Sequence, residues 1–409
     1  MRRAALAYIA WFVAIGVFFP YLPLFYQALG FSFSTIGFLA AIAAATGLVA
    51  GPAWGIVTDR FDRRGRALPV AALLSAVAAA GLWLVGHEAG NPPGGPGGVG
   101  LALVVVAAVA LSAASSGIGP QLDARAVGLV AGDRARYGRL RGWGSLSFIV
   151  TAALVGQVLD RTGPSGLFAV YLPAVVITAV ITFGIPQAAT DEHAPPPVRA
   201  SPLGPGLGDL LRIPELRAYL LAAFAGWAAL NATNAFLSVD LVALGASPNV
   251  VGIAWAVGAG LEVPVMWAFP RLARRFGMER LLVVGPLVLA VRALGCALAP
   301  SPEVLVAVTA LQGIGFALSF VGGVAHVARL SPRRLGATAQ GVFAGATVGL
   351  GAIVGSGMGG LIVGFVTLPG VFALSAAGSV VSAALVARSL AIGRRHADSH
   401  DGSAARMTA

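Results

Sequence analysis

Twelve long apolar runs constrain the fold of this 409-residue chain more than any other feature. The hydrocarbon core of a bilayer is about 30 Å thick, so a helix needs about 20 apolar residues to cross it. Backbone polar groups find no water there, and each run must satisfy them within its own helix. The sequence therefore predicts an all-α membrane protein with twelve transmembrane helices. The predicted spans are 4–28, 34–57, 67–87, 99–131, 142–160, 165–186, 215–243, 248–270, 281–299, 303–329, 336–364 and 368–390.

The composition narrows the function classes. Only 11% of the residues are charged, against about 25% in soluble domains, which excludes a soluble enzyme and a disordered chain. The 27 basic residues are all arginines, spread in short clusters, so no nucleic acid is expected as a partner. Without lysine the chain cannot form the phosphate-binding loop of an ATP-driven pump. The single cysteine, Cys296, excludes a disulfide framework and a cysteine metal site. No cofactor and no metal are expected.

The twelve runs divide into two sets of six. Residues 188–213 form a polar, proline-rich linker that cannot bury a core. We therefore expect an N-terminal six-helix bundle at 1–187, a C-terminal bundle at 214–390 and a tail at 391–409. The halves also share short matches at one constant spacing, which indicates a duplication of the kind that places a solute site between two halves of a transporter. The matches carry Leu29-Gly30 to Leu244-Gly245, Ser32 to Ser247, Gly37 to Gly252 and Arg60-Phe61 to Arg275-Phe276.

The arginines predict the orientation of the chain. Almost all of them fall at the termini or in every second connection, and arginine in short loops marks the cytoplasmic side. Both termini and the linker are therefore expected in the cytoplasm, in a multi-pass protein of the cell's inner (plasma) membrane. The clusters that carry this prediction include Arg2, Arg3, Arg60, Arg63, Arg64, Arg134, Arg139, Arg271, Arg274, Arg329, Arg333, Arg394 and Arg395.

The connection after the second run carries a motif. The segment from Gly55 to Arg64 resembles the signature Gly-x-x-x-Asp-Arg-x-Gly-Arg-Arg of the major facilitator superfamily, with Asp62 in place of the second Gly. The resemblance implies two six-helix bundles that alternately expose one central site. It also implies a gating role for a charge cluster that locks the cytoplasmic side, although plain positive-inside charge is the alternative. The gating candidates are Asp59, Arg60, Arg63 and Arg64.

The segment from Tyr137 to Ser145 narrows the resemblance. It is similar to the start of the fifth helix in the lactose permease and phenylpropionate permease branch, where the second arginine pairs with an acid on the fourth helix. Asp123 occupies the corresponding position, so the resemblance implies that Asp123 and Arg141 bind solute. A guanidinium facing a carboxylate can hold a hydroxylated or anionic solute through several directional bonds. The alternative is a salt bridge that only anchors helix ends.

The comparison with the same branch implies that some of the residues that couple transport to protons are absent. Gln312 and Gly315 stand where lactose permease has its coupling His and Glu. Ionised side chains in mid-membrane cost at least about 2.5–3.5 kcal/mol and need a partner or a wet cavity. Glu262 is such a residue, and Arg292 in the next run is its expected partner. We expect Glu262 and Arg292 to couple transport to protons, with a permanent structural ion pair as the alternative.

Three amides are further candidates for solute binding. Gln312 could bind solute or bridge helices, as membrane amides do at about 1 kcal/mol. Asn231 and Asn234 lie three residues apart on one face of a predicted helix, where lining the cavity and packing are both possible.

The sequence thus predicts a secondary transporter of a small organic solute, not an enzyme, which works by alternating access. Proton-coupled uptake is the preferred form. The alternatives are proton-antiport export of sugars or drugs and a non-transporting membrane sensor. The expected partners are a small-molecule solute, protons and the lipid bilayer, and the chain is expected to act as a monomer with the proton gradient as driving force.

Overall fold

In a computed structural model of the chain, the described residues are 1–62, 65–89, 98–130, 134–185 and 206–407. They form helices and turns without a strand, and twelve of the helical stretches are long and apolar enough to cross a membrane. Each of the twelve overlaps one predicted span, which confirms the predicted fold class. The boundary residues 187 and 188, the linker up to 205 and the positions of Arg63 and Arg64 lie outside the described residues.

The first six spans come from α1 to α7. The fourth span consists of two helices, α4 and α5, separated by a turn at Ser116 and Gly117. The elements are α1 (Arg2–Ala28), α2 (Phe33–Phe61), α3 (Ala67–Ala89), α4 (Gly98–Ser115), α5 (Ile118–Leu129), α6 (Arg134–Thr162), the 3-10 turn η1 (Pro164–Gly166) and α7 (Leu167–Phe183).

The last six spans come from α9 to α15. The eleventh span is built from three pieces, with a π-helical segment between two α-helices. The elements are α8 (Leu207–Leu211), α9 (Pro214–Ala243), α10 (Pro248–Phe276), α11 (Met278–Leu298), α12 (Pro302–Leu330), the 3-10 turn η2 (Arg333–Leu335), α13 (Gly336–Ala344), the π-helix η3 (Gly345–Gly351), α14 (Ala352–Ile362) and α15 (Leu368–Met407).

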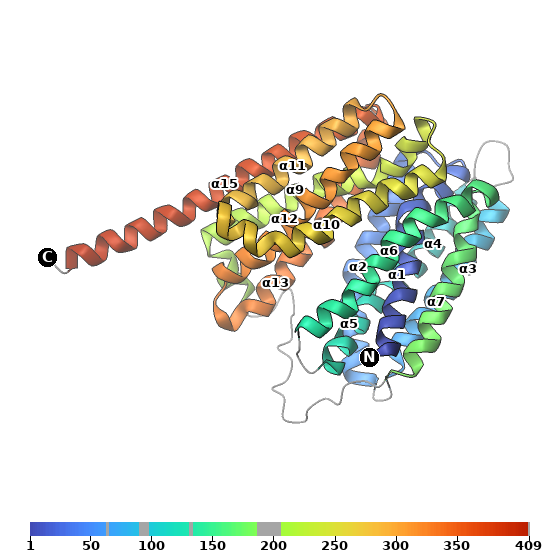
Figure 1. The fold of residues 1–409 in the computed structure, drawn as a ribbon, viewed down its shortest axis with the longest axis horizontal. Helices are drawn as coiled ribbons and strands as arrows, with labels where there is room; N and C mark the ends of the chain where they lie inside the picture. The colour runs from blue at the N-terminus through green and yellow to red at the C-terminus, as the bar shows by residue number, and fades with distance from the viewer. Residues whose placement is uncertain (63–64, 90–97, 131–133, 186–205, 408–409) are drawn as a thin grey trace.

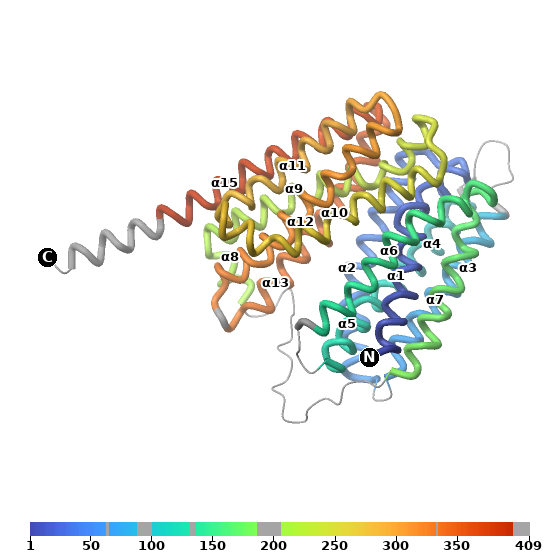
Figure 2. Tube along the Cα trace, viewed as in Figure 1, coloured from blue at the N-terminus to red at the C-terminus, as the bar shows by residue number. Residues whose placement is uncertain are grey.

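The two sets of six spans form two bundles that meet at one end and diverge towards the other (Figure 1). We call the end where α1 and α9 begin the basic end, because Arg3, Arg60, Arg271 and Arg329 lie there. The opposite end is the distal end. The Cα trace shows the last helix, α15, leaving the second bundle at its basic end (Figure 2).

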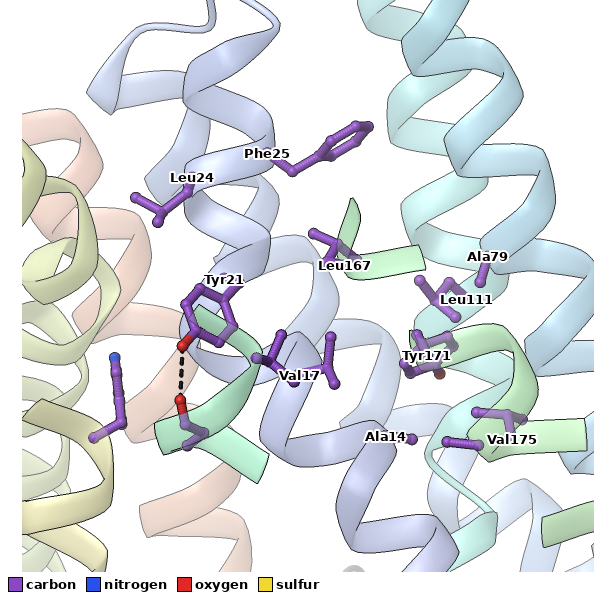
Figure 3. Packing of buried hydrophobic residues seen from close by; sticks show 14 of the residues in the cluster. Ala14, Val17, Tyr21, Leu24, Phe25, Ala79, Leu111, Leu167, Tyr171 and Val175 are labelled. Atoms are coloured by element: carbon purple, nitrogen blue, oxygen red, sulfur yellow. Dashed lines mark hydrogen bonds between the residues drawn. The ribbon is translucent and has the colours of Figure 1, made fainter. Parts of the chain in front are cut away.

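Helix α1 forms the centre of the first bundle and packs on α6 and α7. Its Tyr21 is fully buried and donates a 2.7 Å hydrogen bond to the Ala152 carbonyl of α6 (Figure 3). A 2.8 Å bond between Ser75 and Tyr171 joins α3 to α7. These buried hydroxyls therefore find partners on neighbouring helices, which compensates for the loss of water.

In the second bundle α9 packs against α15 along most of its length. Ser382 donates a 2.7 Å bond to the Ala222 carbonyl, and Ser389 donates a 2.8 Å bond to the Glu215 carbonyl. Small residues let these helices approach closely, which is the usual way in which membrane helices associate.

At the basic end, Asp62 explains the departure from the loop signature. Its carboxylate accepts bonds of 2.6 and 2.7 Å from the Arg66 and Ala67 amides, so it caps the start of α3. The turn instead uses Gly65, whose φ of +67° suits glycine. Asp62 thus caps α3 at the position where the signature has a glycine.

The bundles touch chiefly through two pairs of helices. In the first, α2 lies on α14, and a Cβ at Gly37 would lie 2.6 Å from the Cα of Gly360. In the second, α6 lies on α10, where Gly156 contacts the backbone of Asn249 and Gly252 contacts the carbonyl of Ala152. Both contacts are possible because glycine has no side chain, and both lie in the distal half of the molecule.

Candidate functional site

The first part of the candidate site is a polar cluster between α1, α5 and α6. Tyr8 is buried and donates a 2.5 Å hydrogen bond to Asp123 Oδ1. Tyr137, at the start of α6, lies beside both groups and interacts with each of them. The Asp123 carboxylate is therefore held by the first bundle from two helices besides its own.

Arg141 lies on α6 next to this cluster. Its guanidinium carbon is 4.3 Å from the centre of the Phe12 ring, a cation–π contact worth about 0.5–1 kcal/mol or more. The contact needs Gly144, because a Cβ there would lie 2.8 Å from Phe12 Cδ2. Phe12 thus supports the guanidinium from one face.

Asp123 and Arg141 were predicted to bind solute together. The structure brings both to the same cluster, where each acts electrostatically on Tyr8 and on Tyr137. Among the described residues they do not form an ion pair with each other within 4.0 Å.

Glu262 on α10 faces this cluster from the second bundle. Helices α6 and α10 run antiparallel, with Gly156 against Asn249 and Ala152 against Gly252. When this pairing of α6 with α10 is continued residue by residue towards the basic end, Arg141 comes to the level of Glu262. The two side chains are close enough to interact electrostatically. By this level the helices have separated, because a Cβ at Gly138 or Gly260, on the facing sides, would meet nothing within 4 Å. We call the space that opens here the interbundle gap.

The second bundle presents a mixed polar and aromatic wall from α9 and α12. Gly313 lies against the backbone of α10 at Leu261 and Glu262. Its neighbour Gln312 has a buried side-chain oxygen without a hydrogen-bond partner in the described part of the chain. One turn further, Phe316 stacks on Phe320 at 5.5 Å between ring centres. The predicted role of Gln312 in binding solute stays a prediction, and an unsatisfied buried oxygen favours it.

The two predicted asparagines differ in their surroundings. Asn231 donates a 2.8 Å bond to the Trp227 carbonyl of its own helix. Asn234 has a buried side-chain oxygen without a partner among the described residues. Asn234 therefore keeps a free acceptor, whereas Asn231 uses a donor locally.

Glu262 and Arg292 form no ion pair with each other among the described residues, and their predicted role in proton coupling stays a prediction. Arg292 is 1% exposed inside the second bundle, and it lies beside the buried Cys296 of the same helix. Its Nε and Nη2 atoms have no hydrogen-bond partner in the described ranges. Helix α11 packs mainly on α12 and α15 and makes few contacts with α10, the helix that carries Glu262.

The gating candidates lie at the basic end of α2. Asp59 and Arg60 are exposed, and in the part of the chain that the structure describes neither forms an ion pair. Arg63 and Arg64 fall outside the described residues. Arg125, by contrast, is buried and donates to the carbonyls of Gly65, Thr182 and Ile185. It ties α5 to two turns at the basic end.

Sequence reasoning missed three aromatic residues of the site, namely Tyr8, Phe12 and Tyr137. Tyr137 belongs to the segment that carried the resemblance and could have been suspected from it. Tyr8 and Phe12 lie in an apolar run with several other aromatics, and no spacing rule separates them from residues that pack on lipid. Their role depends on the rotation of α1 against α5 and α6.

Comparisons with known proteins agree with this architecture. A sequence model of the MFS_1 like family matches residues 1–373. A maltose permease of Geobacillus stearothermophilus is 30% identical over 355 residues, which cover 85% of this chain and 84% of that protein. The "Probable 3-phenylpropionic acid transporter" of Escherichia coli K12 is 24% identical and covers 69% of this chain and 70% of its own length. A crystal structure of a mutant of the nucleoside transporter NupG superposes with a TM-score of 0.80 at 18% identity, covering 95% of this chain and 98% of the other.

Proposed function

The chain belongs to the MFS_1 like family, and we propose that it carries a neutral, polyhydroxylated solute into the cell together with a proton. That it is a membrane-embedded secondary transporter of small solutes, and not an enzyme, follows from its family and its relatives. The solute class, the proton and the direction are the proposal.

The charges at the interbundle gap support a neutral solute. Among the described residues, the charged side chains of the candidate site are the acids Asp123 and Glu262 and the base Arg141. An anionic solute would meet one guanidinium and two carboxylates, so its binding would be opposed unless an acid were neutralised. Hydroxyl groups can donate to the acids and accept from Arg141. The relative from Geobacillus stearothermophilus is named for maltose, which is a neutral solute with many hydroxyl groups.

Glu262 is the proposed proton carrier, and its position opposite Arg141 is the observation that carries the proposal. The two charges lie on opposite bundles near the point where α6 and α10 separate, and in the described part of the chain no ion pair within 4.0 Å joins them. Protonation of Glu262 would remove the attraction between the bundles at this point, and a solute bound to Arg141 would compete for the same guanidinium. Proton and solute would therefore act on one interaction.

Alternating access supplies the mechanism. In the structure the distal ends are in contact, while the basic ends are apart (Figure 1). If the arginine-rich end faces the cytoplasm, as the positive-inside rule favours, this is the inward-open state of a protein in the cell membrane with both termini in the cytoplasm. Closure of the basic end would bring the exposed Asp59 and Arg60 towards the second bundle, which supports a gating role for them. We propose that a single chain performs the cycle.

The test uses purified protein in liposomes with an imposed pH gradient. Labelled maltose is the probe, with unlabelled 3-phenylpropionate as competitor. We expect maltose to accumulate when the interior is alkaline and the competitor to have little effect. Glu262→Gln should abolish accumulation but preserve exchange of maltose across the membrane. Glu303→Gln, at an exposed distal position, is the matched control and should behave as the native chain.

Three results would contradict the proposal. Accumulation by Glu262→Gln would remove this residue from the coupling. Accumulation under a reversed gradient would indicate antiport, which is the export alternative. Strong inhibition by 3-phenylpropionate together with no maltose uptake would place the solute among organic acids, as in the relative from Escherichia coli.

A further inference from the structure

A second pocket, whose lining includes neither Asp123 nor Arg141, lies on the first bundle. It has a volume of about 240 Å³, opens to the surroundings, and is formed by one face of α2 and one face of α5. The residues that line it include Trp54, Thr58, Asp59, Gln121 and Arg125, together with Gly51, Gly55 and Gly117.

This pocket faces the region between the bundles. Along α2, Gly37 contacts Gly360, Ala41 lies beside Gly357, and Leu48 lies beside Gly349. These positions recur at helical spacing, so they mark the face of α2 that is turned to the second bundle. Gly55 and Asp59 continue that face towards the basic end. There a Cβ at Gly51 or Gly55 would meet nothing within 4 Å, because the bundles have separated.

Gln121 gives this pocket a feature that packing does not explain. The side chain is only 6% exposed, and neither its oxygen nor its nitrogen has a hydrogen-bond partner in the described part of the chain. A buried amide without partners destabilises a fold, because its polar groups lose their bonds to water and gain none in return. Each such group in a native fold calls for an explanation, of which a ligand or water is the common one.

The other walls are suited to one class of ligand. Trp54 is held in place by a 2.8 Å bond from its Nε1 to the Ala113 carbonyl, and Gly117 leaves room for its ring. The indole therefore offers a fixed flat surface. Thr58 donates to the Trp54 carbonyl at 2.8 Å, which leaves its oxygen free to accept. Asp59 adds a carboxylate that can accept from two adjacent hydroxyls.

The charges in this pocket balance. Asp59 carries the negative charge and Arg125 carries the positive charge. The Arg125 guanidinium already donates to three backbone carbonyls. A neutral ligand meets no net charge here. A ring with adjacent hydroxyls can donate to Asp59, exchange both kinds of bond with Gln121 and place its apolar face on Trp54.

We infer that the pocket between α2 and α5 is a second solute site, which binds a neutral ring-shaped solute with adjacent hydroxyls between its release from the interbundle gap and its departure at the basic end. This inference rests on the proposed function, because it takes the transported solute as the ligand. The site exists in the state with the basic ends apart, so an occupied pocket opposes closure of that end.

The experiment measures protection of single cysteines from a water-soluble maleimide, in purified full-length protein in nanodiscs with maltose as the probe. The native Cys296 is 2% exposed, so the native chain gives the background. Thr58→Cys reports the second pocket, and Gly142→Cys reports the interbundle gap. Phe61→Cys, on the same helix one turn from Thr58 and 76% exposed, is the matched control.

At a maltose concentration about ten times the Kd, we expect alkylation of Thr58→Cys to slow about tenfold, while that of Phe61→Cys stays unchanged. Protection should persist when Arg141→Ala is added, because the second pocket does not use Arg141. Gln121→Leu should remove the protection of Thr58→Cys while leaving Gly142→Cys protected. Leu fills the space of the amide without its unsatisfied atoms, and a native thermal midpoint for this variant would show that it folds.

The outcomes separate the two proposals. Protection of Thr58→Cys without protection of Gly142→Cys would support the second site and contradict the proposed central one. Loss of Thr58→Cys protection in the Arg141→Ala background would overturn the inference, since it would then reflect a conformational change driven from the interbundle gap. Absence of Thr58→Cys protection at saturating maltose would overturn it whatever Gly142→Cys does.

Discussion

Tyr8 of α1 donates a 2.5 Å hydrogen bond to the Asp123 carboxylate of α5. The bond links two helices of the first bundle at the place where the charged groups of the candidate site gather. It fixes one oxygen of Asp123 and leaves the other for Tyr137 or for solute. The geometry of the site therefore depends on a tyrosine as much as on its charges.

Replacement of this tyrosine tests that dependence. Tyr8→Phe keeps the ring and removes the donor, and a hydrogen bond to a charged group contributes about 1.5–3 kcal/mol. We expect a lower thermal midpoint and weaker protection of the protein by solute. Tyr26→Phe is the control, because Tyr26 is buried and its hydroxyl has no hydrogen-bond partner among the described residues. Equal effects in thermal-shift and solute-binding measurements on the two variants would contradict the role given to Tyr8.

A second prediction concerns the shape of the cation at position 141. Lys preserves the charge but loses the planar group that lies over Phe12 and can hold two oxygens at once. Arg141→Lys should therefore weaken solute binding at least about tenfold, which is about 1.4 kcal/mol. Arg139→Lys, at an exposed position on the same helix, should bind as the native chain does. Titration calorimetry would check both, and native affinity in Arg141→Lys would show that only charge matters.

The contact between the distal ends gives a third prediction. A methyl group at Gly37 would lie 2.6 Å from the Cα of Gly360 and 2.8 Å from the Ser356 carbonyl oxygen. Overpacking of this kind costs about 1–3 kcal/mol, so Gly37→Ala should disfavour the state with closed distal ends. Spin labels at Ser165 and Ser301, in two distal turns, should report longer distances. Gly47→Ala adds its methyl group to open space on the same helix, and a shift in that control would exclude the steric explanation.

Arg292 gives a fourth prediction, because its buried guanidinium lacks partners for two of its nitrogens. An uncompensated buried charge destabilises a fold, and its replacement by an apolar side chain is often neutral or stabilising by about 1–4 kcal/mol. Arg292→Met should therefore have an equal or higher thermal midpoint. Arg125→Met should have a lower one, since it leaves three carbonyls without their donor.

The two arginine variants also bear on coupling. If Arg292→Met keeps its stability but loses proton-driven accumulation, Arg292 acts in a part of the cycle that the structure does not display. A midpoint that falls as far as that of Arg125→Met would contradict the account of Arg292 as an unpaired charge.

The sequence by itself determined the twelve spans and the fold class, because the free energy of placing a helix in a bilayer depends mainly on the residues of that helix. The resemblance to the lactose permease branch pointed to Asp123 and Arg141, and the cost of a charge in mid-membrane pointed to Glu262. The sequence could not indicate the turn that divides α4 from α5, or the π-helical segment at Gly345–Gly351, because neither breaks the run of apolar residues.

Only the tertiary structure decided which charges face each other. The sequence analysis joined Glu262 to Arg292, one helix away in the chain, whereas the structure places Glu262 opposite Arg141 in the other bundle. The reason is physical. A side chain's partner depends on the rotation and register of its helix, and here these are set where Gly156 and Gly252 let α6 and α10 touch. Hydropathy contains no information on that contact.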